Sequence, residues 1–73
     1  MDEAIMKITI ELTSFFSSNP FTLDTCAGIA RRMGRDVNLV REALEVFVAK
    51  KVLEKTGQGP DTIYKYLPPY NAF

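Results

Sequence analysis

Apolar residues recur at steps of three and four along the N-terminal two thirds of the chain, a spacing that predicts amphipathic helices. The first helix is expected over residues 3–17. Its apolar face holds Ile5, Ile8, Leu12 and Phe15 or Phe16. Small polar residues and Pro20 follow, and these favour a turn, so the helix stops before them. Residues 21–23 are too few for another helix and indicate an extended stub.

Two shorter helices are expected next, separated by a tight turn. The second covers residues 25–33, with Asp24 as its N-cap because a carboxylate can accept from a free backbone N–H. Gly34 ends it, since glycine suits the left-handed C-terminal position. Asp36 then caps a third helix over residues 37–50. The apolar stripes of these two helices are Cys26, Ile29, Ala30 and Met33, and then Val37, Val40, Leu44 and Phe47 with Ala43 and Val48 beside them.

After the third helix the pattern changes to a period of two. Residues 52–56 predict a short strand, and residues 62–67, which are rich in β-branched and aromatic side chains, predict a second one. A glycine-rich loop of residues 57–61 joins them as a hairpin. Pro68 and Pro69 end the second strand, because proline cannot donate to a ladder. The sequence therefore predicts one α+β domain, mainly α, over residues 1–67 and a short C-terminal tail over residues 68–73.

Composition narrows the possible chemistry. The chain has one cysteine, Cys26, and no histidine, so it lacks the ligands of a Cys/His zinc site and the base of a Ser–His or Cys–His pair. We therefore expect a binding module that is not an enzyme and that uses no metal or cofactor. No apolar run is long enough to cross a membrane, and the N-terminus is acidic where a secretory signal would be basic. We expect a cytoplasmic protein.

The order helix, helix, turn, helix, hairpin resembles the winged helix-turn-helix domains of prokaryotic transcription regulators. The resemblance covers residues 4–67 and centres on Ala30, Gly34 and Val40. Ala30 is small where two helices would cross closely, Gly34 makes the sharp turn, and Val40 anchors the third helix against the second. Leu53 and Tyr64 fit the core pattern of that family.

The resemblance implies a DNA-binding transcription regulator whose partner is double-stranded DNA. The third helix would enter the major groove, with Asn38 and Arg41 contacting bases, and the hairpin wing would lie on the backbone. The residues at which it would contact phosphates are Arg31, Arg32, Arg35, Lys55 and Lys65. Net charge is zero, yet residues 26–55 are mildly basic, which agrees with such a surface.

Other features favour an alternative, a protein-interaction module of the same fold without DNA binding. Glu42 and Glu45 lie on the presumed reading face, where phosphates would repel them. The wing loop 57–61 has no lysine or arginine, and Leu39 and Val46 flank the outer side of the third helix. Arg41 and Glu45 are also spaced to form a pair along the helix. Salt-sensitive binding to DNA would separate the two readings.

Four apolar residues do not fit the core stripes and suggest a contact between two copies of the chain. Met6 and Ile10 lie roughly opposite Ile8 on the first helix, and Tyr70 and Phe73 lie in the tail. Together they predict a homodimer contact. Cys26 lies on a core stripe and is interpreted as a small core residue.

Overall fold

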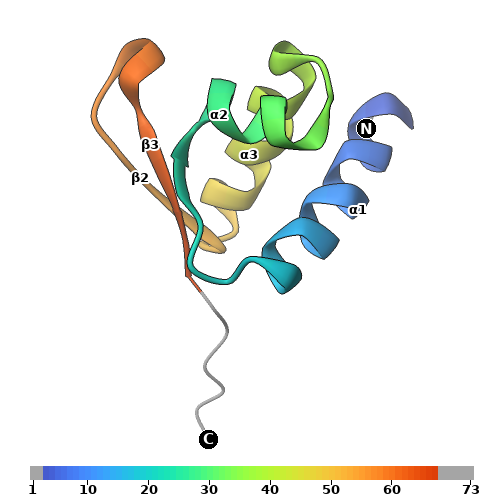
Figure 1. Cartoon of the computed structure of the whole chain (residues 1–73), viewed down its shortest axis with the longest axis horizontal. Helices are drawn as coiled ribbons and strands as arrows, with labels where there is room; N and C mark the ends of the chain where they lie inside the picture. Colours follow the sequence, from blue (N-terminus) through green and yellow to red (C-terminus); the bar gives the residue numbers. More distant parts are fainter. Residues whose placement is uncertain (1–2, 68–73) are drawn as a thin grey trace, which may run out of the picture.

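A computed structural model describes residues 3–67, which form three α-helices and one three-stranded antiparallel sheet. The helices are α1 (Glu3–Ser18), α2 (Cys26–Met33) and α3 (Val37–Ala49). The strands are β1 (Leu23–Thr25), β2 (Leu53–Thr56) and β3 (Ile63–Tyr66), and a 3₁₀ turn, η1 (Gly59–Asp61), lies in the β2–β3 loop. The chain is α+β and mainly helical, as the sequence predicted (Figure 1).

The helix ends follow local capping rules, with one correction. Asp36 caps α3, because its carboxylate accepts from the backbone N–H of Leu39 at 3.2 Å. Gly34 ends α2 in the left-handed conformation with φ 70°, as predicted. The N-cap of α2 is Thr25, however, whose hydroxyl accepts from the Gly28 N–H at 3.1 Å. The prediction of Asp24 was wrong: its carboxylate accepts from the Thr25 N–H at 2.7 Å instead.

The sheet contains the predicted hairpin and one further strand. Its order is β1-β3-β2, so β3 is central and both neighbours run antiparallel to it. The stub expected at residues 21–23 lies slightly later, as β1. The backbone N–H of Tyr66 donates to the Thr22 carbonyl at 3.2 Å, which extends the β1–β3 pairing by one residue. β1 therefore joins the segment between α1 and α2 to the C-terminal hairpin.

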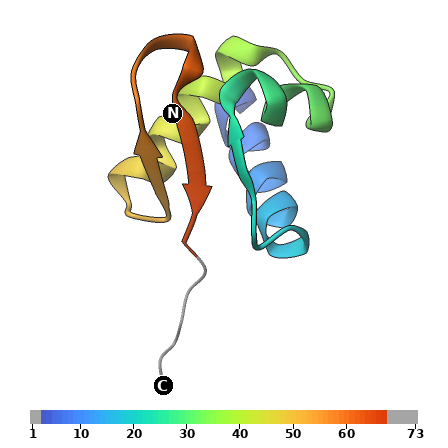
Figure 2. The same cartoon turned by 60° about the vertical axis from the view of Figure 1, so that its left-hand side comes forward.

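The core lies between the helices and one face of the sheet. Figures 1 and 2 show all three helices on the same side of it. The predicted stripes of the helices meet there, since Leu12, Ile29 and Leu44 are all fully buried. Tyr66 closes the bottom of this core by stacking on Phe16, with ring centroids 5.0 Å apart. Leu39, expected on the outer side of α3, is half-buried against the core.

Large apolar side chains are exposed at two places outside this core. Met6 and Ile10 lie on the outer face of α1, 50% and 68% exposed, as the sequence predicted. Phe21 and Leu23 lie at the start of β1, 91% and 64% exposed, and their exposure was not anticipated. Within residues 3–67, no helix combines the length and the apolarity needed to cross a bilayer.

Candidate nucleic-acid interface

Asn38 and Arg41 lie next to each other on the exposed face of α3. Both side chains are in the first two turns after the Asp36 cap, three residues apart and therefore on one side of the helix. The Nη1 of Arg41 donates to the Oδ1 of Asn38 at 3.0 Å. This bond uses one edge of the guanidinium and leaves its other donors unused by residues 3–67. The pair thus presents a partly oriented arginine at the surface.

Glu45 does not lie on the same exposed face. Its carboxylate accepts from Lys55 Nζ at 2.9 and 3.1 Å and from the Tyr64 hydroxyl at 2.8 Å, so it turns toward the sheet. The sequence had placed Glu45 on the reading face and paired it with Arg41; the structure instead links it to β2 and β3. The hydrogen bond from Lys55 is the main cause that lowers the pKa of Glu45, and the Tyr64 bond lowers it further. Burial, with that bond to Glu45, raises the pKa of Tyr64 to about 12.

Three of the five predicted phosphate contacts are engaged inside the molecule. Arg35 binds both carboxylate oxygens of Glu11, at 2.8 and 2.6 Å, and this hydrogen bonding raises its pKa. Arg32 lies 3.8 Å from the Asp24 carboxylate and over the Phe15 ring, 4.8 Å from its centroid. Lys55 is held by Glu45.

The other two predicted phosphate contacts, Arg31 and Lys65, have exposed side chains without a hydrogen bond or ion pair to residues 3–67. Arg31 is on α2, and Lys65 is on the outer face of β3, opposite Glu54 in the ladder. Glu42 is also exposed, one residue after Arg41. The interface therefore has fewer available cations than the sequence suggested, because internal carboxylates hold the rest.

The β2–β3 hairpin offers little to a ligand. Its loop turns through Gly59–Asp61 and carries no basic residue. Beneath it lies a cavity of about 60 Å³, lined by Cys26, Ala27, Arg41, Gly59, Pro60, Thr62 and Tyr64. Cys26 is buried and points its Sγ at the Val37 carbonyl, 3.5 Å away, and burial raises the pKa of its thiol. It behaves as a core residue, as interpreted from the sequence.

The predicted homodimer contact is only partly described. Met6 and Ile10 are exposed on α1, whereas Tyr70 and Phe73 lie outside residues 3–67. The dimer contact therefore stays a prediction.

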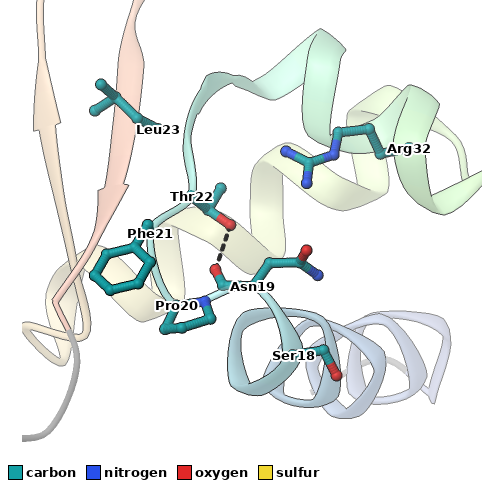
Figure 3. Close-up of a pocket in the computed structure, with 7 residues that line it drawn as sticks. All are labelled: Ser18, Asn19, Pro20, Phe21, Thr22, Leu23 and Arg32. Carbon is teal, nitrogen blue, oxygen red and sulfur yellow. Dashed lines mark hydrogen bonds between the residues drawn. The ribbon is translucent and has the colours of Figure 1, made fainter.

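A second surface feature, missed from the sequence, is an open groove of about 430 Å³ beside β1 (Figure 3). Its lining comes from the end of α1, the segment leading into β1, and α2: Ser18, Asn19, Pro20, Phe21, Thr22, Leu23 and Arg32. The spacing of Phe21 and Leu23, two apart on either side of buried Thr22, was the only sequence signal for it.

In comparisons with known proteins, no family model, no curated protein and no solved structure matches the chain.

Proposed function

We propose that the chain is a winged helix-turn-helix domain that binds double-stranded DNA as a transcription regulator. The order α1-β1-α2-α3-β2-β3, with β3 between the other strands, supports this reading. So does the Gly34 turn between α2 and α3, which ends the first helix of the pair sharply. In this proposal the N-terminal half of α3 enters the major groove and the β2–β3 hairpin lies along the backbone.

The exposed Asn38–Arg41 pair is the observation that carries the proposal. An arginine can donate two parallel hydrogen bonds to the O6 and N7 of guanine, and an asparagine can pair with adenine. The two residues stand on the part of α3 that would go deepest into the groove. Arg31 and Lys65 can reach phosphates without breaking an internal ion pair. Arg35 and Lys55 would first have to leave the carboxylates that bind them, so we assign them a smaller contribution. Arg32 has only a long contact of 3.8 Å with Asp24, so it keeps its hydrogen-bond donors.

The experiment that tests this is a fluorescence-anisotropy titration against mixed-sequence duplex DNA at low salt, repeated at higher salt. Affinity should fall steeply with salt, because each neutralised phosphate releases counterions. Arg41→Ala should weaken this binding at low salt and make it less dependent on salt, because the DNA-facing side of α3 loses a cation. Lys7→Ala is the charge-matched control, since Lys7 is exposed on α1. No binding at low salt, or equal effects of the two variants, would rule out α3 as the DNA-contacting element.

This role is that of a binding module and not of an enzyme. It requires access to DNA, so the proposal includes the cytoplasmic location expected from the sequence. The proposal also includes a homodimer contact through Met6 and Ile10, because a dimer of such domains can bind the two half-sites of a DNA operator.

A protein-interaction role is the second candidate, and one observation favours it: Phe21 and Leu23 are the start of an exposed apolar surface beside an open groove.

A further inference from the structure

β1 is an edge strand with unused hydrogen-bonding groups. The backbone carbonyl of Thr22 accepts from the Tyr66 N–H of β3. Because the backbone groups of successive residues in an antiparallel ladder point alternately toward and away from the paired strand, those of Asp24 also point toward β3 and those of Leu23 point away from it. The N–H and C=O of Leu23 therefore point to the free edge of the sheet. The next outward N–H, that of Thr25, is already bound by the Asp24 carboxylate. Leu23 thus offers one backbone donor and one backbone acceptor at the free edge, and these are the groups with which another strand pairs.

The groove of about 430 Å³ runs along this edge. Figure 3 shows Arg32 reaching across it from α2 toward the segment Thr22–Leu23, with Asn19 at its lower side. Among the lining residues Arg32 is the only charged one. Its guanidinium is held in place by the Phe15 ring beneath it, 4.8 Å to the centroid, and by the weak 3.8 Å contact with Asp24. A fixed cation on one wall favours an acidic group in the groove.

On the other side of the strand, the exposed residues contributed by β1 and the segment before it are apolar, and Lys65 of β3 lies opposite Leu23. Phe21 and Leu23 project away from Arg32 in Figure 3, and both are largely exposed. Ile63, opposite Thr25 in the register, continues this face as a half-buried residue of β3. A strand added beside β1 would place alternate side chains on the two sides. One set would cover Phe21 and Leu23, and the other would enter the groove toward Arg32.

We propose that the β1 edge docks an extended peptide segment of a partner protein, in which apolar and acidic side chains alternate. Backbone bonds to Leu23 supply the pairing, Phe21 and Leu23 receive the apolar side chains, and Arg32 binds a carboxylate. This surface lies outside the Asn38–Arg41 face of α3, so the proposal does not depend on DNA binding.

A peptide fits this edge better than a second copy of the chain does. Ser18, Asn19 and Arg32 stand beside the edge, and β1 is connected within a few residues to α1 and to α2. A second copy would bring the same side chains and helix ends with it. Pairing of two β1 edges would also bring two Arg32 cations toward the same seam, and like charges placed together across an interface are unfavourable. A partner segment without flanking helices has no such obstacle.

Binding of two fluorescein-labelled peptides tests the proposal. One alternates valine with aspartate and the other valine with lysine. The aspartate peptide should bind at least tenfold more tightly, and Arg32→Gln should remove about tenfold of its affinity, as for a lost charge-assisted hydrogen bond. Phe21→Ser should weaken it further. Arg31→Gln is the matched control on the same helix, and it should leave the affinity for both peptides unchanged. Arg31, Arg32 and Phe21 are all exposed, so these variants keep the fold, which thermal melts check.

Amide hydrogen exchange followed by NMR locates the site. Saturation with the aspartate peptide should slow exchange of the Leu23 N–H and shift the resonances of residues 21–24 and Arg32. Three results would overturn the proposal: equal affinity for the two peptides, shifts confined to α3, or binding that Arg32→Gln leaves unchanged. Protection of the Leu23 N–H without peptide, rising with protein concentration, would overturn it in favour of a second copy.

Discussion

The Glu45 side chain stabilises the fold and does not contribute to the proposed DNA-contacting face of α3. It lies on α3, yet its carboxylate accepts hydrogen bonds from Lys55 of β2 and from Tyr64 of β3. The Lys55 pair is about half exposed, so it contributes at most about 1 kcal/mol. The Tyr64 bond is partly buried and adds a contribution of similar size. Together they fix the hairpin against the third helix.

Replacing Glu45 by glutamine should destabilise the domain by about 1 kcal/mol at pH 7, since the charge is lost but the amide oxygen still accepts from Tyr64. The folded-state pKa of Glu45 is lowered from 4.5, so its stabilising effect is complete above that value. The effect is lost as pH falls through the lower, folded pKa. Urea unfolding of the variant and the native chain at pH 7 and near pH 3 measures this.

The difference between the two proteins should shrink on going to the acidic condition. Glu42→Gln is the control, because Glu42 is exposed on the same helix and has no partner within residues 3–67. A difference for Glu45→Gln that stays the same at both pH values would contradict the role assigned to its charge.

Arg41 and Arg35 illustrate which site residues the sequence could predict. The Asn38–Arg41 contact is local, three residues along one helix, so helical spacing was enough to bring the two together. Arg35 pairs with Glu11, 24 residues earlier, and Lys55 with Glu45, ten residues earlier. Those contacts exist because α1 packs beside the Gly34 turn and the hairpin folds back on α3. No local sequence pattern indicates these two long-range ion pairs. The sequence therefore predicted that Arg35 and Lys55 were both available to bind phosphate.

At the scale of elements, the helices were predictable and β1 was not. Each helix carries its own apolar stripe, and its ends are set by local chemistry, as at Gly34 and Asp36. β1 has only three residues and exists because Asp24 pairs with Tyr64, far along the chain. Asp24 and Thr25 are both good caps for α2, and in the structure the Asp24 carboxylate accepts from the Thr25 N–H while the Thr25 hydroxyl caps the helix.

The turn between α2 and α3 depends on the backbone of Gly34. Its φ of 70° is unfavourable for residues with a Cβ, while the space around it is open, with nothing within 4 Å of an added Cβ. The cost of Gly34→Ala should therefore be conformational alone, about 1 kcal/mol. Chemical denaturation measures it.

Gly34→Asn separates conformation from packing at this position, because asparagine tolerates the left-handed region better than alanine does. It should be less destabilising than Gly34→Ala although its side chain is larger. If stability instead fell with side-chain size, crowding and not backbone strain would limit the turn.

At the scale of the whole molecule, α1, α2, α3 and the sheet share one small core. A domain of this length has a free energy of unfolding of about 4–11 kcal/mol. Leu12 is fully buried, in the cluster that also contains Ile29, Leu44 and Tyr64. Leu12→Ala removes contacts to several elements at once and should cost about 2–5 kcal/mol. That is a large fraction of the total, so the melting temperature should fall by about 10–30 °C.

The same melt tests whether the domain unfolds as one unit. Because all three helices and the strands β2 and β3 contribute residues to one cluster, Leu12→Ala should lower a single transition that helical and aromatic signals report alike. Ile10→Ala is the control on the same helix, since Ile10 is 68% exposed and its loss removes little buried area. If α1 merely frayed away, Leu12→Ala would reduce the helical signal first and leave the environment of Tyr64 intact up to the native melting temperature. Phe16 of α1 stacks on Tyr66 of β3, so loss of α1 must disturb the sheet as well. This coupling is the physical reason to expect one transition.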